Sequence, residues 1–351
     1  MESLLPWTIV IPLIGAGLII LARHRPNLRE TVTLLTAAAL FLSVVSLTPA
    51  VLDGGRPSLV IWGILPGLDL MLRVEPLGML FGLVASGLWI VNSLYSIGYM
   101  RGNKEQSQTR FYFFFAVSLA AAIGVAFAGN MLTLFMFYEI LTICTYPLVT
   151  HSGTAEAVKS GRTYLGILIS TSIGLLMVGI IWTWNAAGTL DFTPGGILKG
   201  KVSDGLIGVL LFLYMYGIGK AALMPIHRWL PAAMVAPTPV SALLHAVAVV
   251  KAGVFTVLKV IIYIFGIELV NGTAASLLLA GIAAATLLFA SVIAMQKDNL
   301  KARLAYSTVS QLSYIILGAA IATGASVIGG GMHIAMHAFG KITLFFCAGA
   351  I

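Results

Sequence analysis

Residues 111–138 read FYFFFAVSLAAAIGVAFAGNMLTLFMFY, a long run without a charged side chain. A membrane-spanning helix needs about 20 mostly apolar residues, because it must pair its backbone polar groups internally where there is no water. The run exceeds that length, and Gly129 and Asn130 within it are typical of a turn. It therefore predicts two membrane helices joined by a tight connection.

Similar apolar runs fill the rest of the chain. The 351 residues are 59% hydrophobic and 9% charged, with a mean hydropathy of +1.02. This composition excludes water-soluble, disordered, collagen-like and nucleic-acid-binding proteins. Division of the runs at turn residues predicts an all-α, polytopic membrane bundle of eleven spans, at about 4–22, 31–52, 74–100, 111–128, 131–150, 163–186, 205–227, 239–265, 273–295, 303–322 and 328–351.

Basic residues are divided unevenly between the loops. One set of alternate loops carries 12 Lys and Arg residues, and the other set carries four. Because cytoplasmic loops are enriched in Lys and Arg, the first set is expected in the cytoplasm and the N-terminus outside. The first apolar run is not expected to be a cleaved signal peptide, since it begins with Glu2 and ends at Arg23 and Arg25 without a small-residue cleavage site.

Ionisable side chains inside the apolar runs are the candidate functional residues. A charge at the bilayer centre costs about 3 kcal/mol on insertion scales, so such side chains usually face the bundle interior and mark an ion or proton pathway. Lys259 lies nearer the outer interface and is expected to extend its ammonium group to the headgroups. The candidates for a proton relay are Glu139, Lys220, Lys251, His245, His333, His337 and Lys341.

Local sequence suggests how two groups of candidates would work. Glycines and Pro225 around Lys220 predict a helix that is broken at membrane depth, where ions or waters can bind. His333, His337 and Lys341 are four residues apart and stay within about 80° of one helix face, so waters could bridge them into a proton wire. If Glu139 approaches Lys220, the lysine keeps its proton, and it releases the proton when the pair opens.

No metal site or cofactor is expected. Cys144 and Cys347 lie far apart in separate apolar runs, which supports neither a disulfide nor an iron–sulfur site. Two histidines on one helix without nearby Cys, Asp or Glu make a poor zinc site. The glycine-rich segment 324–331 lacks the Lys-Ser/Thr of a phosphate-binding loop. The chain itself is therefore not expected to be an enzyme, unless it belongs to a redox-driven translocase.

Four motifs resemble one family of membrane proteins. They are KAALMPIHRWLPAAMVAPTPVSALLHAVAVVKAG at 220–253, FYEILTICTYPLV at 137–149, DNLKARLAYSTVSQLSYI at 298–315 and HIAMHAFGKITLFFCAGAI at 333–351. They are similar to the antiporter-like proton-translocating subunits shared by Mrp multisubunit cation/proton antiporters, respiratory complex I and membrane-bound hydrogenases. Within that family the chain looks most like the D-type subunit of the Mrp group.

The resemblance implies inverted five-helix repeats and a bacterial or archaeal plasma-membrane location. It divides the chain into a three-helix segment at 1–110, a first repeat at 111–265 and an incomplete second repeat at 273–351. It also implies that Glu139 and Lys220 form a charged pair, that Lys251 is the central lysine, and that the histidine stripe connects onward. Many relatives have an acidic residue where this chain has Ala232, and the chain is expected to be a fragment because it stops near the eleventh span.

Three functions remain open from the sequence. The first is a proton-conducting subunit of a monovalent cation/proton antiporter, with other membrane subunits, protons, sodium or potassium ions and the lipid bilayer as partners. The alternative is a proton-pumping subunit of a complex I-like oxidoreductase or a membrane-bound hydrogenase. The second alternative is a self-contained solute transporter, which is disfavoured because the chain lacks two full repeats and a cluster of Arg or aromatic residues for a solute headgroup.

Overall fold

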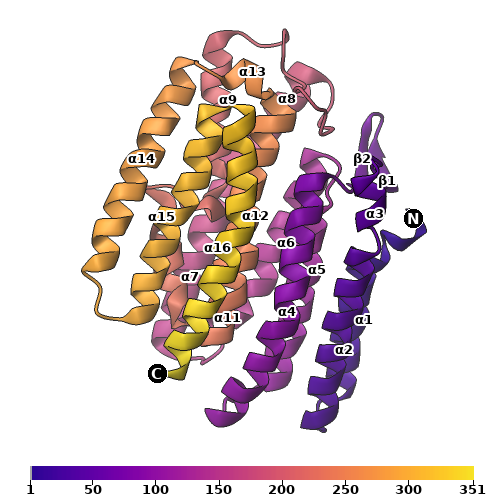
Figure 1. Ribbon diagram of the computed structural model, residues 1–351, viewed down its shortest axis with the longest axis vertical. Helices are drawn as coiled ribbons and strands as arrows, with labels where there is room; N and C mark the ends of the chain where they lie inside the picture. The colour runs from indigo at the N-terminus through magenta and orange to yellow at the C-terminus, as the bar shows by residue number, and fades with distance from the viewer. Residues whose placement is uncertain (1) are drawn as a thin grey trace.

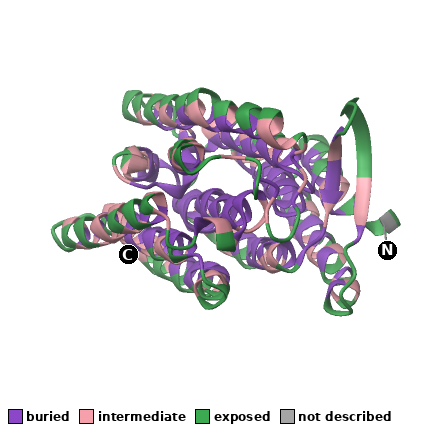
Figure 2. Ribbon diagram, turned by 90° about the horizontal axis from the view of Figure 1, so that it is seen from above, coloured by how far each residue is buried: buried purple, intermediate pink, exposed green. Residues whose placement is uncertain are grey.

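Apolar side chains cover both the inside and the outside of a bundle of helices. The computed structural model describes residues 2–351. Buried residues gather at the centre of the bundle and exposed residues lie on its outer faces (Figure 2). Large apolar side chains on these outer faces, such as Leu35 and Leu278, are 65% and 67% exposed. An apolar exterior of this kind is suited to contact with lipid chains.

The N-terminal part of the chain lies at one side of the bundle, where α1 and α2 are beside α4 and α5 (Figure 1). The loop expected near 53–73 contains a two-stranded antiparallel hairpin that the sequence did not predict. Pro66 and Gly67 form its turn, and Gly67 has a φ of +81°. The elements are η1 (Glu2–Leu4), α1 (Trp7–Leu21), α2 (Pro26–Val45), α3 (Thr48–Leu52), β1 (Ser58–Leu65), β2 (Leu68–Arg73) and α4 (Pro76–Gly102).

The tight connection predicted at Gly129 and Asn130 joins α5 to α6. Asn130 caps α6, since its side-chain oxygen accepts a hydrogen bond of 2.8 Å from the Thr133 backbone N–H. The elements of this part are α5 (Gln108–Ala126), α6 (Met131–Val149), α7 (Ala155–Thr171), the π-helical turn η2 (Ser172–Leu176), α8 (Met177–Ala187) and α9 (Asp204–Gly217).

The predicted break at Lys220 is present, because α9 ends at Gly217 and a short 3₁₀ turn follows it. Gly253 of α12 lets this turn pack closely, since a Cβ atom at Gly253 would overlap the backbone of Lys220 and Ala221. The segments are η3 (Gly219–Ala221), η4 (Ile226–Arg228), α10 (Trp229–Ala232), η5 (Ala233–Val235), α11 (Thr238–Leu243), the π-helical η6 (Leu244–Ala248), α12 (Val249–Lys259) and the π-helical η7 (Val260–Phe265).

The C-terminal helices lie on the side of the bundle opposite α1 and α2 (Figure 1). They are α13 (Ile267–Val270), α14 (Ala274–Met295), α15 (Leu300–Ile321) and α16 (Gly324–Ala350). Within the described residues, eight helical segments are long and apolar enough to cross a membrane, and Trp7–Leu21 and Asp204–Gly217 are shorter apolar helices. The mostly helical membrane bundle is therefore confirmed, whereas the count of eleven spans and the repeat boundaries stay predictions.

Gly253→Ala is expected to destabilise the protein by about 1–3 kcal/mol, because its methyl group must displace the backbone that carries Lys220. Gly166→Ala is the matched control, since Gly166 lies in α7 with open space around its Cβ position. Thermal unfolding of both purified variants in detergent measures the difference. Equal melting temperatures for the two variants would contradict the close packing of η3 on α12.

Candidate functional site

Lys220 lies fully buried at the break after α9, where α6 supplies its hydrogen-bond acceptors. Its Nζ donates to the Tyr138 carbonyl oxygen at 2.8 Å and to the Thr142 hydroxyl at 2.5 Å. The Tyr138 ring centroid is 3.1 Å from the same Nζ, and the Tyr138 hydroxyl accepts from the Lys220 backbone N–H at 3.0 Å. All of these partners are uncharged, so the ammonium group is held by dipoles and a ring rather than by a carboxylate.

Glu139 does not form the predicted ion pair with Lys220. The ion pairs among residues 2–351 do not include this pair, and both carboxylate oxygens of Glu139 are buried without a hydrogen-bond donor from that part of the chain. Two neighbouring residues of α6 thus differ in their relation to Lys220. The Tyr138 carbonyl oxygen accepts from Lys220, whereas the Glu139 carboxylate does not contact it. In the mechanism predicted from the sequence, Lys220 keeps its proton while Glu139 is close and releases it when the two separate. The structure corresponds to the separated arrangement.

Lys251 of α12 and His337 of α16 meet in the bundle interior, whereas His333 is half-buried and lines an open hollow with Gln311 and Tyr314. The Lys251 Nζ contacts the His337 Nδ1 atom, although the two residues are 86 positions apart in sequence. The His337 ring stacks on the His333 ring, with centroids 5.7 Å apart and planes 4° apart. Lys341 donates from its Nζ to the Ser307 hydroxyl at 2.7 Å and lies one further turn along α16. His333, His337 and Lys341 thus follow one another at four-residue spacing along α16, as the sequence predicted, while the contact of His337 with Lys251 was not predicted.

His245 lies apart from that line, in the π-helical turn η6. It is 1% exposed, and neither ring nitrogen has a hydrogen-bond partner among residues 2–351. Its ring is surrounded by aromatic edges, with centroids 5.9 Å from Tyr164 and 6.4 Å from Trp229. His245 therefore packs against Tyr164 and Trp229, and the Trp229 indole in turn donates to the Gly219 carbonyl oxygen beside Lys220.

The expectation that the Lys259 side chain extends to the headgroups is wrong. It is fully buried and pairs with Glu75 at 2.8 Å, while its Nζ also donates to the Ala128 carbonyl oxygen at 3.3 Å. The Phe192 ring centroid is 4.0 Å from the same nitrogen. Glu75 was not among the residues predicted from the sequence, although its position directly before the apolar run at 76–100 places an acidic side chain at a membrane boundary.

A second buried cluster joins the first helices at the end where the basic loops lie. Glu30 pairs with Arg101 and lies 3.6 Å from Arg29, and both Glu30 and Arg29 are buried. Arg29 and Arg101 are two of the 12 basic loop residues from which the cytoplasmic side was predicted. In the structure they also connect helices. The Glu30 carboxylate of α2 accepts from Arg101 of α4, and Arg29 of α2 donates to the Gln108 side chain of α5 at 2.6 Å.

His151 follows α6 and lies outside the membrane-spanning segments. Burial, with a further contribution from the Arg110 guanidinium, lowers the pKa of His151 to about 4. The imidazole is therefore uncharged near neutral pH, and its approach of 3.8 Å to the Glu105 carboxylate is not an ion pair under those conditions.

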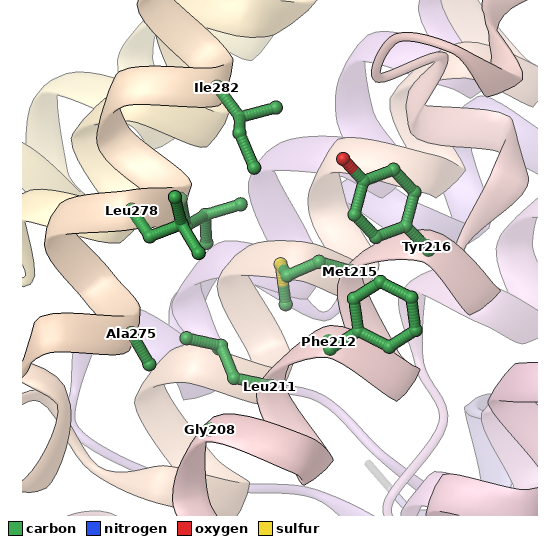
Figure 3. Close-up of a pocket in the computed structure, with 9 residues that line it drawn as sticks. Gly208, Leu211, Phe212, Met215, Tyr216, Ala275, Leu278 and Ile282 are labelled. Carbon is green, nitrogen blue, oxygen red and sulfur yellow. The ribbon is translucent and has the colours of Figure 1, made fainter.

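An apolar groove of about 70 Å³ lies between α9 and α14 (Figure 3). Phe212 and Leu278 line it, and its only hydroxyl group belongs to Tyr216, which donates to the Met224 carbonyl oxygen at 3.3 Å. The lining of the groove therefore contains no lysine, histidine or carboxylate. Over residues 2–351 no three His, Cys, Asp or Glu side chains cluster as metal ligands would.

The bundle and its buried ionisable side chains define a multi-pass membrane protein with an antiporter-like fold. The family described as NADH:quinone oxidoreductase/Mrp antiporter, transmembrane, matches residues 128–351, and the chain belongs to this family. This match confirms the family that the four sequence motifs predicted.

Two relatives illustrate the range of the family. A probable K(+)/H(+) antiporter A/B subunit of Rhizobium meliloti is 32% identical over 324 residues, which cover 90% of this chain and 31% of the relative. The "NAD(P)H-quinone oxidoreductase subunit 5, organellar chromatophore 1" of Paulinella chromatophora is 30% identical over 367 residues, which cover 99% of this chain and 54% of the relative. The chain spans about half the length of the curated relatives it matches, or less.

Two solved structures share the fold. A chain of the Mrp complex from a Dietzia species superposes with a TM-score of 0.84 at 26% identity, over 97% of this chain and 37% of the other. A chain of the archaeal membrane-bound sulfane sulfur reductase superposes with a TM-score of 0.86 over 100% of this chain and 71% of the other. At 24% identity the second likeness shows the fold alone. The assignment to the D-type Mrp subunit stays a prediction, because the named relatives are of the A/B and 5 types.

Lys259→Met is expected to destabilise the protein by about 3–5 kcal/mol, because it leaves the buried Glu75 carboxylate without its counter-charge. The double variant with Glu75→Gln removes both charges and should recover much of this loss. Thermal unfolding in detergent measures both variants. A double variant that is less stable than Lys259→Met would show that the destabilisation has another cause.

Proposed function

We propose that the chain is a proton-conducting membrane subunit of a multisubunit monovalent cation/proton antiporter. The contact between Lys251 and His337 carries the proposal, because it joins a buried lysine at the centre of the bundle to a stripe of histidines. Gly253 supports the continuity of the path, since it brings the backbone of Lys220 against the same helix that carries Lys251. Buried titratable groups that are costly in a membrane usually serve transport.

Protons would pass between neighbouring groups along this path. Lys220 holds its proton against neutral oxygen atoms, so it can release that proton without leaving an unpaired carboxylate in direct contact. Approach of Glu139 would stabilise the charged lysine, and withdrawal would favour release. Lys251 would then exchange a proton with His337, and His333 and Lys341 would continue the path along α16 through bridging waters.

The setting of the relay is part of the proposal. The N-terminus would lie outside a prokaryotic plasma membrane, since the basic loops favour the cytoplasm. The segments 1–110, 111–265 and 273–351 would correspond to a leading helix group, one complete repeat and part of a second repeat. Other membrane subunits would complete the assembly and select the coupled cation, in agreement with relatives that are named as subunits.

A redox-driven proton pump is the second candidate. The names of several relatives favour it, since they are NAD(P)H-quinone oxidoreductase subunits. Flavin or iron–sulfur absorbance in the purified native assembly would support the pump. Proton flux in vesicles that depends on sodium or potassium, without that absorbance, would support the antiporter.

Glu139→Gln, Lys220→Ala, Lys251→Ala and His337→Ala are each expected to lower proton flux by about tenfold or more, because each removes a group that holds or transfers the proton. Flux is measured with the assembled complex in vesicles that carry a pH-sensitive dye. Lys199→Ala is the control, because Lys199 is an exposed lysine that pairs with Glu268 at the surface.

Unchanged flux in all four relay variants, at normal abundance of the complex, would refute the relay. Equal loss in Lys199→Ala would show that the assay responds to assembly rather than to proton transfer. A loss restricted to the relay variants distinguishes conduction from a scaffold role for the bundle.

A further inference from the structure

A buried pair of hydroxyl groups joins α6 to α7 near Lys220. The Thr145 hydroxyl and the Tyr164 hydroxyl are 2.5 Å apart, and either can be the donor. Both side chains are fully buried. Neither residue was predicted from the sequence, because Thr and Tyr are ordinary components of membrane helices and carry no charge.

The pair lies between two of the titratable candidates. Thr145 is three residues from Thr142 on α6, which is about 4.5 Å along the helix axis, and Thr142 accepts from the Lys220 Nζ. On the other side, the Tyr164 ring centroid is 5.9 Å from that of His245. Polar groups therefore lead from His245 through Tyr164, Thr145 and Thr142 to Lys220.

The ring nitrogens of His245, which have no hydrogen-bond partner, indicate the end at which a proton would enter this line of polar groups. His245 and Ser241, which lies four residues earlier on α11, are both buried, and their ring nitrogens and hydroxyl oxygen have no hydrogen-bond partner among residues 2–351. Both residues follow the loop that contains Arg228, one of the basic loops expected in the cytoplasm. The helix that leaves this loop therefore carries two buried polar side chains, and one of them, His245, packs against Tyr164 of the hydroxyl pair.

Thr145 can reverse the hydrogen bond to Tyr164. A hydroxyl group has one hydrogen and two acceptor lone pairs. When the Thr145 hydrogen points to the Leu141 carbonyl oxygen, which is 2.7 Å away, the Tyr164 hydroxyl donates to Thr145. When it points to Tyr164 instead, the direction of the bond is opposite. Rotation of one C–O bond is therefore enough to reset the pair.

We propose that Tyr164 and Thr145 carry protons between His245 and Lys220, as the input branch of the relay. This step rests on the proposed function. A water that bridges a His245 ring nitrogen and the Tyr164 oxygen, which do not hydrogen-bond directly, takes a proton from His245 and passes one to Tyr164 while Tyr164 gives its own hydrogen to Thr145. Thr145 gives its hydrogen in turn toward Thr142 and Lys220, across a distance that one water can bridge. No bond other than O–H and N–H bonds changes, and the net result is one proton gained by Lys220 and one lost by His245.

The alternative is that the pair only holds two helices together. Thr183 of α8 and Tyr214 of α9 provide the matched control, because their hydroxyl groups form a similar buried pair at 2.8 Å. Neither contacts any of the relay lysines or histidines through a hydrogen bond described for the chain. A purely structural role predicts the same consequences for both pairs.

Tyr164→Phe and Thr145→Val each remove one hydroxyl group and keep the shape of the side chain. We expect each to lower proton flux of the assembled complex in vesicles by about tenfold, with abundance and thermal stability equal to those of Tyr214→Phe and Thr183→Val. Flux in the two control variants should equal that of the parent. Thr145→Ser restores the hydroxyl group and should recover flux, which a packing role for the threonine methyl would not predict.

Two outcomes would overturn the proposal. One is normal flux in Tyr164→Phe and Thr145→Val, and the other is an equal loss of flux in the control pair. Lys220→Ala, measured alongside, separates this result from the relay itself. Loss of flux in Lys220→Ala with normal flux in Tyr164→Phe rejects only the input branch, whereas normal flux in both rejects the proposed function as well.

Discussion

The structure is constrained by the free energy that it costs to bury an ammonium group within a helix bundle that lies in lipid. Water is not available there to solvate the charge, so the protein must supply oxygen atoms, rings or counter-charges at short range. Lys220 and Lys259 are both fully buried, and each is surrounded by such groups. The helices that supply them are consequently fixed relative to one another around these two nitrogens.

The two lysines meet the constraint in different ways, which indicates different roles. Lys259 has a carboxylate partner, a carbonyl oxygen and an aromatic ring, and such a set keeps the proton in place. Lys220 has only neutral acceptors and a ring, while Glu139 lies beside it without touching it. Loss of a proton from Lys259 would strand the Glu75 charge, but loss of a proton from Lys220 strands no charge in direct contact. The first arrangement suits a structural tie, and the second suits exchange.

Irregular helices make the exchange site possible. A break in a helix frees backbone carbonyl groups for side chains, and here the Gly219 carbonyl oxygen accepts from the Trp229 indole N–H at 2.9 Å. The break after α9 places Lys220 on a short turn, and Gly253 allows that turn to approach α12. The π-helical turn η6 shifts the register of the same long helix at His245, a feature that is frequent at functional sites. Lys220 and His245 thus lie where the helices are irregular, whereas their polar neighbours on α6 and the stripe on α16 lie on regular helices.

The sequence alone determined that the protein lies in a lipid bilayer and where most of its helices are, because the hydropathy and length of the apolar runs can be read directly along the chain. It also identified the break at Lys220 through glycine and proline, and the stripe of His333, His337 and Lys341 through helical spacing. It did not predict the hairpin at 58–73, because a short loop between spans carries no membrane signal.

Pairings between distant segments were decided by the tertiary structure. The contacts of Lys259 with Glu75 and of Lys251 with His337 join residues separated by 184 and 86 positions. The absence of an ion pair between Glu139 and Lys220 is likewise a feature that the sequence did not predict. A sequence states which groups are costly to bury, whereas packing alone decides which neighbour stabilises each one.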